Sequence, residues 1–178
     1  DRAKANLAAV NYHFGDKERL YEAAVIEAHR CGMGSHSEMF TEELGPEETI
    51  RHFVRLFLTN IMAKGRTGSW YDALMLREMI QPSPASDSLV RETIRPRFER
   101  LLKAMRSVRP DAEERELHAM VFSVVGQCLH YKFARPISVR LIGDEAYEQL
   151  DLEFLTDHIT GFTLAAIGLT PALVKGGT

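Results

Sequence analysis

The amino-acid sequence predicts an all-α protein. Apolar residues recur at intervals of three and four in several long segments, which is typical of amphipathic helices. Glycine or proline stands at the ends of these segments, where helices stop. No segment alternates β-branched and polar residues between hairpin turns, so we expect no sheet. The apolar share of 45% and the charged share of 26% are ordinary for a globular chain of 178 residues.

The helices expected from this spacing follow one another along the whole chain, and a loop is expected at residues 143–149. The helices span residues 7–13, 16–31, 46–64, 69–81, 87–109, 111–134 and 150–169.

Several helix ends carry recognisable signals. Pro46 is the favoured first residue of a helix, and two glutamates follow it near the positive end of the helix dipole. Asp111 and Glu114 have the spacing of a capping box. Pro96 falls inside the helix expected at 87–109, so we expect a kink or a break near Ile94 or Arg95.

Two features bear on the cellular location. No run of about 18 apolar residues occurs and no signal peptide is apparent, so we expect no membrane span. Cys31 and Cys128 lie far apart, without the close spacing of a zinc or disulfide framework. We therefore expect a cytoplasmic protein with reduced thiols.

The helix at 111–134 is apolar nearly all round, which indicates burial on every side. The helix at 150–169 carries small residues that allow close helix approach. Two interpretations fit: these helices form a four-helix interface between two copies of the chain, or the first is the central helix of a monomeric bundle. The residues expected at the dimer interface are Leu117, Val121, Val124, Cys128, Leu155, Ile159 and Phe162.

The segment from Leu7 to Tyr21 carries the most functional information. It predicts a very short helix, a turn at Gly15 and a long helix capped by Asp16. Small residues let a helix enter the major groove of DNA closely, asparagine can pair with adenine, and tyrosine, histidine and lysine can reach phosphates. The candidate DNA-binding residues are Asn6, Ala9, Asn11, Tyr12, His13 and Lys17.

Charge alone gives the DNA interpretation little support. The formal net charge is −3, and residues 1–31 contain five basic and five acidic residues. A helix-turn-helix also needs two supporting helices before the recognition helix. Only six residues precede Leu7, so we expect the sequence to begin inside such a domain.

Polar side chains scattered in otherwise apolar helices predict a pocket for a small apolar or aromatic effector with one polar or anionic group facing Arg77. The alternative is structural: Arg77 pairs with a carboxylate, and Gln127 satisfies a backbone group or its symmetry mate. The residues expected to line the pocket are Trp70, Leu74, Arg77, Phe122, Gln127 and Tyr131.

Signals for an enzyme are missing. The sequence has no HExxH or HxH array, no GxSxG, no phosphate-binding loop and no GxGxxG. Glu114 and His118 are four residues apart, which more often gives a surface pair than a metal site. We expect no catalytic residues, no metal and no cofactor.

The segment Asn11-Tyr12-His13-Phe14, followed by Lys17 and a long helix, closely resembles the recognition helix of the TetR family of bacterial transcriptional regulators. The runs Leu76–Met79, Ile94–Phe98, Val124–Leu129 and Phe133–Pro136 resemble the C-terminal domain of the TetR subgroup that includes CecR.

The resemblance implies a homodimeric, ligand-responsive repressor of operator DNA. Residues 1–31 would be the end of the helix-turn-helix domain with its connecting helix, and residues 32–178 the domain for effector binding and dimerisation. Tyr12 and Lys17 would contact phosphates, Phe14 and Leu20 would pack in the small domain, and the connecting helix would swing when effector binds. The alternative, which the net acidity permits, is a ligand-binding or dimerisation module without a DNA role.

Overall fold

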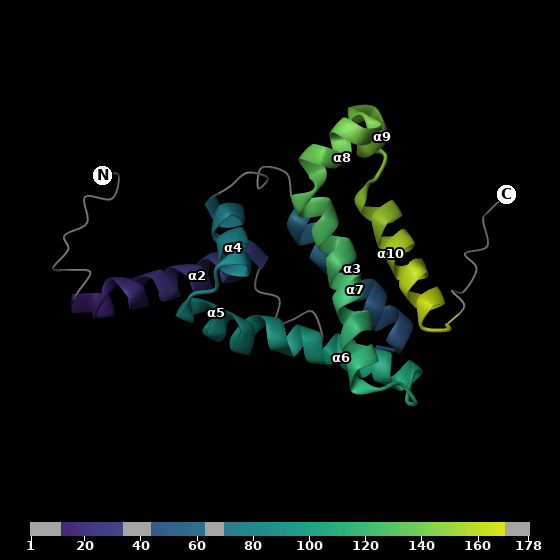
Figure 1. Cartoon of the computed structure of the whole chain (residues 1–178), viewed down its shortest axis with the longest axis horizontal. Helices are drawn as coiled ribbons and strands as arrows, with labels where there is room; N and C mark the ends of the chain where they lie inside the picture. The colour runs from purple at the N-terminus through teal and green to yellow at the C-terminus, as the bar shows by residue number, and fades with distance from the viewer. Residues whose placement is uncertain (1–11, 34–43, 63–69, 170–178) are drawn as a thin grey trace. The chain divides into compact units, whose positions relative to one another are not determined.

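The structure is a computed structural model that describes residues 12–33, 44–62 and 70–169, and these residues form helices without a strand (Figure 1). The all-α prediction is therefore confirmed. No helix among the described residues is long and apolar enough to cross a membrane. The chain divides into two compact units, and we describe each by itself.

The smaller unit contains α2 (Lys17–Met33), α4 (Trp70–Ile80) and α5 (Pro84–Leu89). The part of its apolar core that the structure describes is small: Val25, Ala85 and Leu89 are buried, and half-buried side chains from α2 and α4 pack against them. Both α4 and α5 contact α2. The border between the two units differs from the one expected after residue 31. Helices α4 and α5 come after that residue but belong to the unit of α2, because they cover its apolar face.

The run from Pro84 to Val108 is helical but not uniform. Alpha-helix α5 is followed by a π-helical turn, η2 (Val90–Ile94), and then by α6 (Arg95–Val108). The irregular turn lies just before Pro96. In a regular α-helix the proline ring would clash with the carbonyl of the fourth residue before it, and proline has no N–H to donate. The expected kink is thus a widened turn, in which the Arg95 N–H donates to the Val90 carbonyl. The sequence predicts that this helix begins at residue 87, but it begins at Pro84. Ser83 caps it, because the Ser83 side chain accepts a hydrogen bond from the Ala85 N–H at 3.3 Å.

The larger unit contains α3 (Pro46–Met62), most of α6, α7 (Glu114–Phe133), α8 (Arg135–Ile142), α9 (Asp144–Glu148) and α10 (Leu152–Ala166). Helix α3 contacts both α7 and α10. The facing sides of α3, α7 and α10 form one core together with α6. The large, fully buried side chains of this core are Ile50, Val54, Leu58, Leu101, Met105, Leu117, Val121, Leu155, Ile159 and Leu164.

Two sequence-based boundaries in this unit are wrong. The capping pair of α7 is not Asp111 and Glu114: the Glu116 carboxylate accepts from the Glu113 N–H at 3.1 Å, two residues later. The loop expected at 143–149 contains the short helix α9, whose Tyr147 is buried and donates its hydroxyl to the Tyr131 carbonyl at 3.2 Å.

Replacing Leu155 by alanine should lower the free energy of unfolding by about 2–5 kcal/mol, because a buried leucine leaves a cavity. Leu155 is 1% exposed in the core, whereas Leu141 on α8 is 78% exposed. The matched control Leu141→Ala should change stability by about 0.5 kcal/mol or less. Urea unfolding followed by circular dichroism measures both, and equal losses would contradict this assignment of the core.

Candidate nucleic-acid interface and its supports

In the described part of the candidate DNA-binding segment, Tyr12 and His13 lie in a short helical turn before α2, and Lys17 is the first residue of α2. Tyr12 is 85% exposed, and His13 and Lys17 are also exposed. The rings of Tyr12 and His13 meet edge to face at 5.1 Å between centroids. Phe14 is exposed in the described residues and does not pack in a core as expected, and Leu20 is half-buried. The other candidates, Asn6, Ala9 and Asn11, lie outside the described residues.

The turn that joins this segment to α2 forms as the sequence predicted. Gly15 adopts a φ of 85°, which residues with a side chain rarely adopt. The Asp16 carboxylate then accepts from the Arg19 N–H at 2.8 Å, which caps the first turn of α2. The exposed side chains of Tyr12, His13 and Lys17 are therefore attached to α2 through a short, capped turn.

A buried carboxylate holds α2 against α4 and α5. Glu78 of α4 is 5% exposed, and both of its oxygens accept hydrogen bonds. Oε1 accepts from the Tyr21 hydroxyl of α2 at 2.6 Å. Oε2 accepts from the Ser83 N–H at 3.1 Å, from the Ser83 hydroxyl at 2.7 Å and from the Ser86 hydroxyl at 2.7 Å. One carboxylate thus joins three helical segments.

The pKa of Glu78 reflects these bonds. Burial by itself raises the pKa of a carboxyl, but the hydrogen bonds from Tyr21, Ser86 and Ser83 outweigh it and hold the pKa of Glu78 at about 2. The same bond from Tyr21, together with burial, raises the pKa of the Tyr21 hydroxyl. Glu78 is therefore ionised at neutral pH.

A second set of polar contacts lies beside Glu78. The Ser88 hydroxyl donates to Glu22 of α2 at 2.6 Å and accepts from Arg91 at 3.1 Å. The guanidinium of Arg77 lies over the Tyr21 ring, 5.6 Å from its centroid. Tyr21 and Glu22, neighbours in sequence, thus each bind a different part of the run from α4 to α5.

The predicted effector residues fall into two groups. In the smaller unit, Leu74 packs against the small core, while Arg77 stacks on Tyr21. The backbone of Trp70 begins α4. In the larger unit, Tyr131 packs against the core of that unit, and Gln127, one turn earlier on α7, donates to the Ser123 carbonyl at 3.4 Å.

Phe122 does not share a side of α7 with the other two residues. At about 100° per residue it lies about 140° around the helix from Gln127. It is 63% exposed and packs against the Phe98 ring at 5.6 Å between centroids. Phe122 therefore belongs to the outer face of α7.

Six of the seven residues expected at a dimer interface are buried inside a single chain. Their side chains pack against α3 and α6, so they form the core and are not available to a second copy; they are Leu117, Val121, Val124, Cys128, Leu155 and Ile159. This assignment is corrected: α7 has one buried side, not burial all round. Burial also raises the pKa of the Cys128 thiol to about 12. Only Phe162 is exposed, at 60%.

Sequence reasoning missed Phe154 and the role of Glu78. Phe154 is exposed on α10, and its ring is parallel to that of His158, with 6.0 Å between centroids. The sequence did contain a signal for Phe154: it precedes Phe162 by eight residues, so the two rings lie on neighbouring sides of the same helix. Glu78 stood out as a charge in an apolar helix, but its partner Tyr21 lies 57 residues away in sequence.

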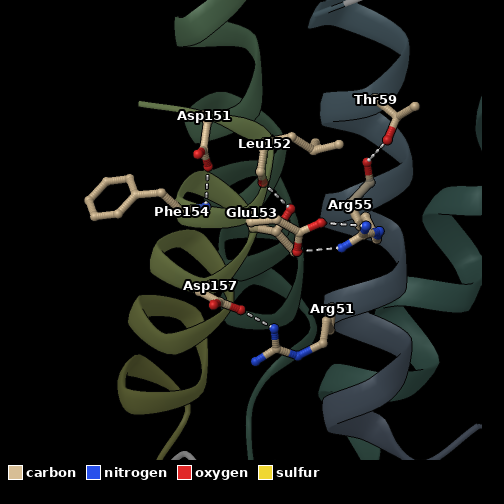
Figure 2. Close-up of polar contacts among 9 residues, drawn as sticks. Arg51, Arg55, Thr59, Asp151, Leu152, Glu153, Phe154 and Asp157 are labelled. Atoms are coloured by element: carbon tan, nitrogen blue, oxygen red, sulfur yellow. Dashed lines mark hydrogen bonds and ion pairs between the residues drawn. The ribbon is translucent and has the colours of Figure 1, made fainter. Parts of the chain in front are cut away.

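Ion pairs fix how α10 lies along α3 (Figure 2). Arg55 binds both oxygens of Glu153 at 2.5 and 2.7 Å, and Arg51 pairs with Asp157 one turn along (Figure 2). The residue numbers of the pairs rise along α3 and fall along α10, so the two helices are antiparallel. Hydrogen bonds from Arg55 lower the pKa of Glu153. These side chains are exposed, so the pairs define the alignment more than they add stability.

The described residues contain no group of three or more His, Cys, Asp or Glu side chains arranged to hold a metal ion. His118 contacts Glu114 at 3.3 Å and packs on the Phe98 ring, as a surface pair does.

Acid should remove the contribution of Glu78 to stability. The pKa of a glutamate is 4.5 in its ordinary state and about 2 in the folded protein, so the unfolded chain binds more protons between these values. The contribution is complete above about pH 4.5 and is lost as the pH falls towards 2. Urea unfolding at pH 2–6 should therefore show the difference between wild type and Glu78→Gln shrinking over this interval. Exposed Glu148→Gln is the control, and a difference that stays constant with pH would contradict the prediction.

Comparison with known proteins assigns residues 46–167 to a family, and these residues include α4 and α5 of the smaller unit as well as the helices of the larger unit. A family model of the C-terminal domain of CecR, an HTH-type transcriptional dual regulator, matches residues 46–167, which is more than half of the chain. A search of curated proteins finds no match. The matched residues begin with the first residue of α3 and end directly after α10. The chain therefore belongs to the CecR C-terminal domain family, a domain of TetR-type transcriptional regulators.

Proposed function

We propose that this protein is a one-component transcriptional repressor that binds operator DNA as a homodimer and releases it when a small molecule binds. The observation that carries the proposal is the exposed Tyr12–Lys17 segment at the start of α2, in a chain that belongs to a transcription-regulator domain family. The Gly15 turn and the Asp16 cap give this segment a fixed attachment to α2. Tyrosine and lysine at such a position contact phosphates, and the preceding residues reach bases.

A homodimer is supported by the outer faces of α7 and α10. Phe122, Phe154 and Phe162 expose large rings on these helices. On the same helices a Cβ added at Gly126 or Gly161 would meet nothing within 4 Å, so both glycines leave open space. Exposed rings beside open glycines suit an interface in which each copy inserts side chains into the other. Two recognition helices could then contact half-sites one turn of DNA apart.

The proposed effector contacts on α7 are Gln127 and Tyr131, which are one helical turn apart. Phe122 is better suited to the contact between copies, because it lies on the outer face. An effector releases DNA by binding the DNA-incompetent arrangement more tightly than the competent one.

The test of the DNA role is fluorescence anisotropy of the full-length protein with the DNA upstream of its own gene, at two salt concentrations and against random DNA. Salt-dependent binding that prefers the upstream DNA would support the repressor. Binding equal to that of random DNA would favour the alternative, a ligand-binding or dimerisation module without a DNA role.

Lys17→Ala should weaken binding to all DNA sequences and reduce the slope of log affinity against log salt by about 1 per protomer, because one phosphate contact is lost. Lys103, exposed on α6 in the larger unit, gives the matched control Lys103→Ala. An unchanged slope in Lys17→Ala would remove this residue from the interface.

Phe162→Glu should convert the dimer to monomers without unfolding them, because the side chain is exposed in one chain and a charge is costly in an apolar interface. Light scattering measures the mass, and circular dichroism checks the fold. Leu141→Glu on the exposed side of α8 is the control. A charge at buried Val124 should instead unfold the chain. A Phe162→Glu protein that remains dimeric would place the interface elsewhere.

A further inference from the structure

We propose that Glu78 is a positioning residue for DNA recognition: through the Tyr21 hydroxyl it fixes the orientation of α2, and with it the Tyr12–Lys17 segment, on α4 and α5. This inference rests on the proposed function, because it concerns how the DNA-contacting segment is held. Glu78 itself does not belong to that segment.

The two oxygens of Glu78 have separate partners. Among the described residues, Oε1 accepts from the Tyr21 hydroxyl of α2 at 2.6 Å, and Oε2 accepts from Ser83 and Ser86 where α5 begins. A carboxylate accepts several hydrogen bonds and donates none, so it can bind donors from two other segments at once. The geometry of one side chain therefore sets the position of α2 relative to two other segments.

The apolar contacts between α2, α4 and α5 that the structure describes involve few and mostly small side chains. Among the described residues of this unit, the buried apolar side chains are Val25, Ala28, Ala85 and Leu89, and the first three are small. Apolar contacts are not directional, whereas hydrogen bonds to a buried charge are directional and costly to leave unmade. Glu22, which accepts from Ser88, adds a second directional tie at the next residue of α2.

The tie lies close to the DNA-contacting segment. Tyr21 is four residues after Lys17, about 6 Å along the helix axis and about 40° around it. The capped turn at Asp16 and Gly15 continues directly from there to Tyr12. A change in the tilt of α2 at Tyr21 would therefore move the exposed side chains that meet DNA.

Loss of this tie should reduce the fraction of molecules with α2 in the competent orientation. The apparent affinity falls by that fraction, whereas the number of phosphate contacts in the bound state stays the same. A positioning residue thus lowers affinity with an unchanged salt slope. A contact residue such as Lys17 changes the slope, and a residue with a merely structural role changes neither while the protein stays folded.

The experiment compares Tyr21→Phe and Glu78→Gln with the control Tyr147→Phe in the full-length protein. This control also removes one tyrosine hydroxyl that donates a hydrogen bond, because the Tyr147 hydroxyl donates to the Tyr131 carbonyl at 3.2 Å in the larger unit. Anisotropy with the upstream DNA is measured at a temperature where all variants are folded by circular dichroism. We expect Tyr21→Phe and Glu78→Gln to bind about tenfold more weakly with the wild-type salt slope. We expect Tyr147→Phe to bind as the wild type does.

Hydrogen exchange of the α2 amides in the same proteins tests the positioning role of Glu78 separately from the proposed repressor function. We expect faster exchange at residues 17–28 in Tyr21→Phe than in the wild type or in Tyr147→Phe. Folded Tyr21→Phe that binds the DNA as tightly as Tyr147→Phe, or that keeps the wild-type protection of α2, would overturn the role of Glu78. If the wild type itself does not prefer the upstream DNA, the repressor proposal fails, and the exchange result alone decides whether Glu78 holds α2.

Discussion

The antiparallel packing of α3 on α10 is the contact on which the larger unit depends. It buries Leu155 and Ile159 of α10 with Ile50 and Val54 of α3, and the ion pair of Arg55 with Glu153 fixes the alignment at the rim. Two of the threonines on the buried side of α10, Thr156 and Thr163, donate their hydroxyls to carbonyls of their own helix. This packing turns Phe154 and Phe162 outward, and so leaves exposed the apolar side chains that we propose contact a second copy of the chain.

The smaller unit is organised by a different kind of interaction. Its described residues form a small apolar core, and a buried carboxylate with four hydrogen bonds joins its helices. Such a network contributes more to a unique arrangement than to net stability, because a buried charge has lost its hydration. The two units thus suit different tasks: the larger has a closely packed core, and the smaller has directional ties next to the exposed segment that we propose contacts DNA.

Local signals in the sequence were read correctly where the physics is local. The turn at Gly15 and the cap at Asp16 depend on neighbouring residues, and both form. The π-helical turn before Pro96 follows from the missing N–H of proline, although its form was not predicted. The capping pair of α7 was placed two residues too early, because Asp111 and Glu113 both precede a suitable glutamate and local spacing does not choose between them.

The sequence by itself determined the all-α class and the resemblance of its recognition segment, since helical periodicity and turn residues act over a few positions. Tertiary structure alone decided which side of each helix is inside. Val124 and Phe122 are both apolar residues of α7, yet the first is core and the second is exposed, because α3 and α6 cover one side. It also decided that Glu78 meets Tyr21, a pairing across 57 positions that no local pattern specifies, because it depends on how α4 and α5 pack on α2.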